Sequence, residues 1–224
     1  MTGRRLIIFS LAVLVAIGTF FYLAMPPEPR YQGRTLSAWI YDYYDSMDFG
    51  TKLPNPAAAR QASLHAIKEM GTNAIPTLLQ WSRATDFPMK RKLNSLLNRQ
   101  TFISYRFPTA GQKESMAELC FEELGDDALP AVPALIEISR SGDSNRRCRA
   151  LGCLLAITQK KEIVLPPLLD AFHTSTGTVQ WQAAWFLQSS YPDEAEKAGV
   201  YQKFPDWKTP VTNTAPTNSP APNK

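Results

Sequence analysis

The two histidines, His65 and His173, are the first residues to test for general acid–base or metal-binding chemistry. His65 lies off the apolar stripe of the helix predicted around it, so we expect it to be exposed. His173 ends a predicted helix, where a cationic side chain suits the helix dipole. Neither belongs to a histidine–cysteine cluster with metal-ligand spacing. We therefore predict no metal site and no catalytic histidine.

The three cysteines, Cys120, Cys148 and Cys153, form no CxxC pair. An odd number in a chain of 224 residues does not describe a disulfide framework, so we predict free thiols in a core. No G-x-S-x-G elbow or other signature of an activated nucleophile is present. The sequence therefore predicts neither an enzyme nor a cofactor.

A basic cluster is the first candidate for partner binding. Lys90, Arg91 and Lys92 lie in a predicted amphipathic helix, with Arg99 and Arg106 following. Such a patch could hold an acidic protein surface, an anionic polysaccharide or lipid head groups. The alternative is a solvated polar face opposite the leucine stripe of the same helix.

An aromatic group is the second candidate. Trp39 and Tyr43 fall on the apolar stripe of a helix that begins after Thr35, its predicted N-cap, so they are expected to cover an open end of the fold. Tyr41 and Tyr44 lie off that stripe and could contact a partner or a membrane interface.

The segment Leu6–Ala24 carries no charged residue and is long enough to span a bilayer as a helix. Arg4 and Arg5 precede it, so the positive-inside rule predicts a cytoplasmic N-terminus and a C-terminal domain outside the cytoplasm. A cleaved signal peptide is the alternative, although Tyr22 would then occupy a position that requires a small residue. We predict an inner-membrane anchor.

The charge balance does not indicate a nucleic-acid-binding protein. The formal net charge is +4, and two of these charges come from Arg4 and Arg5. The rest of the chain is therefore close to neutral, without the strongly basic surface that binding to polyanions requires.

An apolar pattern recurs from Pro56 onward, and it leaves no place for strands. Four predicted helices carry a stripe at helical spacing: Ser63, Ala66, Ile67 and Met70; Ala117, Cys120, Phe121 and Leu124; Ala150, Cys153, Leu154 and Ile157; and, more weakly, Ala183, Phe186, Leu187 and Ser190. A proline and a second apolar helix follow the first three stripes, in AIPTLLQW, VPALIEI and VLPPLLDAF. Equivalent positions 63, 117, 150 and 187 are 54, 33 and 37 residues apart, and spacings in the thirties are typical of two-helix repeats. The extra helix FPMKRKLNSLLNRQ accounts for the longer interval.

The stretch MGTNAIPTLLQW is predicted to be a joint between two helices. Gly71 can adopt the positive φ that ends a helix, and Pro76 suits the first turn of the next helix. Thr72 or Asn73 is expected to cap that second helix, as Asp126 or Asp127 would after Gly125. A phosphate-binding loop would need more glycines or a Lys-Ser/Thr pair, so we reject that interpretation.

The copy LHAIKEMGTNAIPTLLQW resembles a HEAT repeat, and the resemblance covers about residues 56–190. HEAT units often carry an arginine three residues before the small stripe residue. Arg60 and Arg147 match that position, whereas Glu114 and Gln180 do not. The order of anchor, YQGRTLSAWI helix and GTNAIPTLL unit looks like that of membrane-anchored HEAT-repeat proteins of Verrucomicrobia-like bacteria.

The predicted fold is all-α, a short HEAT-like α-solenoid of antiparallel helix pairs behind a membrane helix. Its predicted parts are an anchor or signal peptide (1–25), a linker and capping helix (26–55), helical repeats (56–207) and a disordered Pro/Thr/Asn-rich tail (208–224). The resemblance implies a non-enzymatic adaptor or scaffold that binds an unidentified protein partner. A HEAT-like lyase or isomerase acting on a partner protein is one alternative, and a structural spacer is another.

Overall fold

The computed structural model describes residues 28–48, 53–86 and 108–208. The predicted anchor Leu6–Ala24, the basic residues Lys90, Arg91, Lys92 and Arg99, and tail residues 209–224 lie outside these ranges. Within them, no helix is both long enough and apolar enough to cross a membrane. The structure is mostly helical, which confirms the all-α class. The chain divides into two compact units, Met1–Val164 and Leu165–Lys224, and each is described by itself.

A small hairpin, which the sequence analysis did not predict, precedes the first described helix. Strands β1 (Arg30–Tyr31) and β2 (Arg34–Thr35) pair antiparallel. Gln32 and Gly33 between them have φ values of 50° and 77°, as the tight turns of two-residue hairpins require. Helix α2 (Leu36–Asp45) then begins where the Thr35 hydroxyl accepts a hydrogen bond from the Ala38 N–H at 3.3 Å, which confirms the predicted cap.

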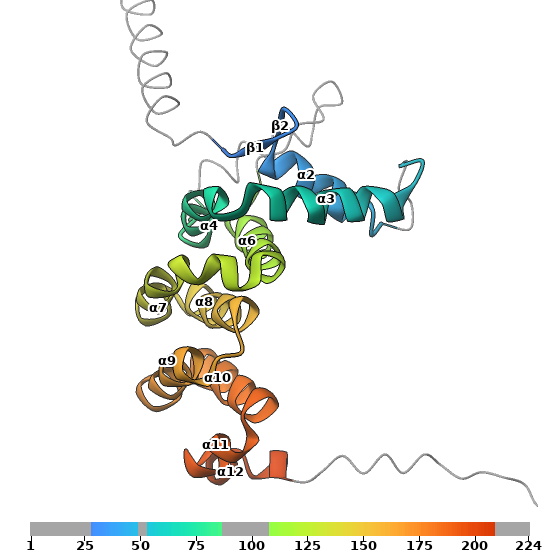
Figure 1. Cartoon of the computed structure of the whole chain (residues 1–224). Helices are drawn as coiled ribbons and strands as arrows, with labels where there is room; N and C mark the ends of the chain where they lie inside the picture. The colour runs from blue at the N-terminus through green and yellow to red at the C-terminus, as the bar shows by residue number, and fades with distance from the viewer. Residues whose placement is uncertain (1–27, 49–52, 87–107, 209–224) are drawn as a thin grey trace, which may run out of the picture. The chain divides into compact units, whose positions relative to one another are not determined.

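The remaining helices follow in the order shown in Figure 1. In the first unit they are α3 (Pro56–Met70), η1 (Gly71–Ala74), α4 (Ile75–Ser82), α6 (Ala110–Leu124), η2 (Gly125–Ala131), α7 (Val132–Arg140) and α8 (Ser144–Ile157). Helix α9 (Lys161–Thr174) crosses the division between the units. The second unit continues with α10 (Gly177–Ser190), α11 (Pro192–Lys197), α12 (Val200–Lys203) and η3 (Pro205–Lys208).

The first three predicted stripes form the core of the first unit. Every residue of these stripes on α3, α6 and α8 is buried. Helix α2 packs on α3, α6 packs on both α3 and α4, and α8 packs on both α6 and α7. Each helix pair therefore buries its apolar face against the pair that precedes it, as Figure 1 shows from blue-green to yellow.

The joints between paired helices contain a glycine at positive φ, as predicted. Gly71 and Gly125 have φ values of 52° and 54°. The predicted side-chain caps were wrong: η1 and η2 run directly into α4 and α7, and no side chain caps those helices. The backbone is already helical at Ala74, so its first N–H groups are engaged by the 3₁₀ turn. Asp126 instead lies 3.0 Å from Lys160, whose hydrogen bond lowers the pKa of that carboxyl.

A side-chain donor links the end of one helix to the start of the next. The Arg147 Nε donates to the Ser139 carbonyl at 2.9 Å, and the Gln180 Nε2 donates to the Phe172 carbonyl at 2.7 Å. In both pairs the donor stands eight residues after the acceptor. Carbonyls in the last turn of a helix have no partner within it, so these donors satisfy groups that would otherwise remain unpaired. Arg60 does the same for Ser46, at 3.4 Å.

The Gln180–Phe172 hydrogen bond corrects the predicted alignment of the fourth stripe with the other three. Gln180 is the equivalent of Arg147, so Ala183, not residue 187, corresponds to Ala150. The buried face of α10 includes Val179, Ala183 and Leu187, whereas the predicted Ser190 is exposed. The repeat spacing from α8 to α10 is therefore 33 residues, the same as from α6 to α8.

Replacing Gly71 with alanine tests whether the joint requires glycine. An added Cβ would meet no atom within 4 Å, so its cost comes from the backbone conformation alone. Gly71→Ala should lower the free energy of unfolding by about 1–3 kcal/mol, measured by urea denaturation.

Gly111 provides the matched control, because it lies within α6, has no positive φ and is equally open. Gly111→Ala should raise the free energy of unfolding by about 0.5–1 kcal/mol. A Gly71→Ala protein as stable as the wild type would contradict this account of the joint.

Candidate protein-binding surface

The exposed face of α2 presents three large side chains. Tyr41, Tyr44 and Met47 are 40%, 38% and 46% exposed, at intervals of three residues along the helix and its C-terminal turn. Leu36 and Ile40 of the same helix are both fully buried. Large apolar side chains that remain exposed together are typical of protein-docking surfaces. The structure thus places Tyr41 and Tyr44, both predicted from the sequence, on one exposed face.

Helix α2 is held rigidly by the hairpin before it. The Trp39 indole N–H donates to the Tyr31 carbonyl at 3.2 Å. The Arg34 guanidinium lies 4.2 Å from the centre of the Trp39 ring and 2.8 Å from the Asp42 carboxylate. Trp39 is only 8% exposed, as its predicted covering role requires. These contacts fix α2 against the hairpin.

Tyr44 extends this surface toward α6 and α8. Burial is the main reason that the pKa of its phenol is raised, and Cys120, Tyr43 and Glu118 raise it further. Arg149 of α8 acts in the opposite direction. Tyr44 is therefore within electrostatic range of Glu118 and Arg149. We group the exposed side chains of α2 with the ion-paired residues of α6 and α8 and call them the α2–α6–α8 surface: Tyr41, Tyr44, Met47, Glu114, Glu118 and Arg149.

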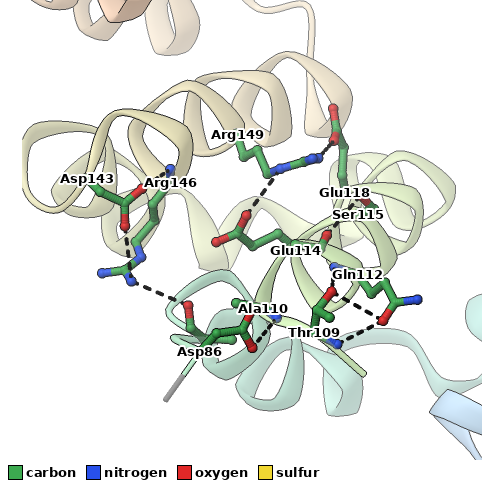
Figure 2. Close-up of polar contacts among 12 residues, drawn as sticks. Asp86, Thr109, Ala110, Gln112, Glu114, Ser115, Glu118, Asp143, Arg146 and Arg149 are labelled. Carbon is green, nitrogen blue, oxygen red and sulfur yellow. Dashed lines mark hydrogen bonds and ion pairs between the residues drawn. The ribbon is translucent and has the colours of Figure 1, made fainter. Parts of the chain in front are cut away.

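Arg149 bridges two carboxylates of α6. Its Nε lies 3.2 Å from Glu114 Oε2, and its Nη1 lies 3.3 Å from Glu118 Oε2 (Figure 2). The arginine side chain is 38% exposed, whereas that of Glu114 is 9% exposed. The pair to Glu114 is consequently more shielded from water than an ordinary surface ion pair.

Glu114 stands where the other repeats carry a hydrogen-bond donor. The equivalent residues Arg60, Arg147 and Gln180 each donate to a carbonyl of the preceding helix, which a carboxylate cannot do. Desolvation raises the pKa of Glu114, although Arg149 opposes this, while Asp143 contributes to the increase. A dehydrated carboxylate in this position departs from the structural pattern of the repeat.

The polar cluster continues to the start of α6. The Asp86 carboxylate accepts a hydrogen bond from the Ala110 N–H at 2.9 Å (Figure 2). Arg146 Nη2 donates to the Ala84 carbonyl at 3.3 Å. Thr109 and Gln112 cap α6 reciprocally. Residues 86 and 110 therefore lie in contact.

The other residues considered for chemistry lie apart from this surface. His65 is exposed and lies 3.5 Å from the Tyr31 hydroxyl and 4.0 Å from Glu69. Cys120 and Cys153 are buried free thiols, and burial raises the pKa of both. Across residues 28–48, 53–86 and 108–208, no group of three or more His, Cys, Asp or Glu side chains could hold a metal ion. The basic cluster, Lys90–Lys92 with Arg99, lies outside the described residues.

Sequence reasoning missed the Glu114–Arg149–Glu118 contact. Glu114 and Glu118 are one helical turn apart, which is visible in the sequence, but Arg149 comes from another helix. The sequence signal that could have pointed to this contact is Glu114 itself, a carboxylate at the position where HEAT units often carry an arginine. No protein-family model, curated protein or solved structure matches the chain, so the role of this surface rests on its geometry.

Substitution of Glu114 tests its unusual environment. Because its pKa is raised, the folded protein holds the proton of Glu114 more tightly than the unfolded chain does. The free energy of unfolding should therefore fall as pH rises from below 4.5, the ordinary value, through the raised pKa. Glu114→Gln does not titrate, so this part of the decline should disappear when urea unfolding is measured between about pH 3.5 and 7.5.

Glu122→Gln is the control, because it removes an exposed carboxylate from the same helix and should keep the wild-type pH profile. An unchanged slope in Glu114→Gln would show that Glu114 is not dehydrated in the folded protein.

Proposed function

We propose that the chain is a HEAT-like repeat protein whose α2–α6–α8 surface binds another protein. The observations that carry the proposal are the exposed set Tyr41, Tyr44 and Met47 and an arginine held between two carboxylates. Tyrosine and arginine are enriched among residues that contribute most to protein–protein affinity. Both kinds of group are held in place here before any partner arrives.

The repeat assignment is supported by three features. Two of the three intervals between helix pairs are 33 residues, and two of the joints have a glycine at positive φ. A donor at one equivalent position satisfies the end of the preceding helix in three of the units. Stacked units of this kind expose helix faces whose residues can vary without disturbing the core, which makes them suitable binding scaffolds.

The chemistry of the surface favours a particular kind of partner. Glu114 and Glu118 together carry more charge than Arg149 neutralises, so the polar part of the surface is negative. A partner that places an apolar side chain against Tyr41 and Met47, and a lysine or arginine beside Glu118, would match it. The apolar segment Leu6–Ala24 is proposed to tether the protein to the cytoplasmic membrane, with this surface on the outer side.

A photo-crosslinking amino acid placed at position 41 or 47 in cells tests this function. Both positions should capture the same protein, because both lie on one face of the surface. Capture should fall at least several-fold when Tyr44→Ala is added, since a buried aromatic contact is commonly worth 2 kcal/mol or more, while Asp45→Ala on the same helix should retain capture.

A crosslinker at the exposed position 61 of α3 serves as the background control. The proposal fails if positions 41 and 47 capture nothing beyond what position 61 captures, or if Tyr44→Ala leaves the captured protein unchanged.

A further inference from the structure

The second unit exposes two tryptophans on one face of α10. Trp181 and Trp185 are one helical turn apart and are 46% and 45% exposed. Indole rings bury large apolar areas in most folded proteins, so two exposed neighbours indicate a surface with an occupant. Phe204 and Trp207, from the segment after α12, lie against the same helix, and we call these four residues the aromatic surface.

The aromatic surface is built with defined geometry. The Trp207 ring meets Trp181 edge-on, with centroids 5.8 Å apart and planes at 83°, and Phe204 stacks on Trp207 at 4.6 Å. The Gln188 side chain donates to the Trp207 carbonyl at 3.2 Å, which fastens η3 to α10. The rings of Trp181, Trp207 and Phe204 are therefore in direct contact and form a continuous aromatic face.

An open, shallow depression of about 520 Å³ adjoins these rings. Its lining residues are Gly177, Thr178, Gln180, Trp181, Lys203 and Phe204. That volume lies within the range of pockets that hold ligands. Trp181 and Phe204 belong both to the depression and to the aromatic surface, so the two features are continuous.

The tryptophans also offer unused hydrogen-bond donors. Within the part of the chain that the structure describes, the indole N–H groups of Trp181 and Trp185 have no hydrogen-bond acceptor. A polyproline II segment is complementary to such a surface, because it presents proline rings and backbone carbonyls that form no internal hydrogen bonds. Proline-rich peptides bind aromatic-lined grooves in this manner.

We propose that the aromatic surface binds the proline-rich tail of the same chain, residues 209–224. The tail begins directly after Lys208, the last residue of η3, so it starts at the edge of the surface. It contains Pro210, Pro216, Pro220 and Pro222 and no charged residue before Lys224, which suits an apolar surface. Tethering supplies a millimolar effective concentration, so even weak contacts with the rings suffice for occupancy.

The tail is long enough to reach the aromatic surface on α10. Its residues would span about 50 Å as polyproline II, at roughly 3.1 Å per residue, which is more than enough to turn back over α10. This inference is independent of the partner proposed for the α2–α6–α8 surface, because it concerns residues of the other unit only.

The test compares the full chain with the chain truncated after Lys208, both in detergent micelles and both labelled with 5-fluorotryptophan. In ¹⁹F NMR spectra, the Trp181 and Trp185 resonances should shift on truncation. Those of Trp39 and Trp81, which are 8% and 6% exposed, should not. A synthetic peptide of residues 209–224, titrated to millimolar concentration, should restore the original positions saturably.

A full-length variant with alanine at positions 210, 216, 220 and 222 is the matched control, because it keeps the tail and removes only the prolines. Its Trp181 and Trp185 resonances should lie at the truncated positions. The proposal is overturned if truncation shifts neither resonance, or if the shift depends on protein concentration, which would indicate a second copy as the occupant. A shift that depends on the detergent concentration would indicate a membrane surface, and it would overturn the proposal as well.

Discussion

The described fold depends on a hydrogen bond that a side chain donates to an otherwise unpaired backbone carbonyl at the end of the preceding helix. Arg147 and Gln180 make it across the same interval of eight residues, although one is charged and the other is neutral. What is required at this position is a long side chain with an N–H donor. Each such bond is worth about 1–3 kcal/mol, and it fixes how one helix leaves the one before it. The glycine joints within the pairs complete the arrangement, because they reverse the chain without a side-chain cap.

The single departure from this arrangement within the described residues coincides with the candidate binding surface. At Glu114 the donor is replaced by a carboxylate, and Arg149 of the next repeat compensates for its charge. This exchange leaves the Arg149 guanidinium partly exposed. Proteins tend to break their own structural rules where function requires it. The same substitution thus explains both an interruption of the repeat and the polar half of the surface.

The sequence predicts the helices and their buried stripes well, because apolar spacing is a local property that the chain itself records. It places the first three stripes and the positive-φ glycines correctly, and it fails at Thr72, Asn73 and the register of α10. A side-chain cap at Thr72 or Asn73 and a 3₁₀ turn that runs directly into α4 are both compatible with the local sequence. The structure shows the 3₁₀ turn. Contacts between helices distant in sequence, such as Glu114 with Arg149 and Trp181 with Trp207, have no local signature.

Hydroxyl-radical footprinting in native membranes is the most direct test that the α2–α6–α8 surface is occupied by a partner. Met47, Tyr41 and Tyr44 are all exposed in the isolated chain and are readily oxidised, and Tyr201 of the other unit can serve as a reference. Relative to Tyr201, these three residues should be oxidised several-fold more slowly in membranes than in the purified protein. Equal oxidation rates in the two preparations would contradict the central claim, because they would show that no partner covers the surface in the membrane preparation.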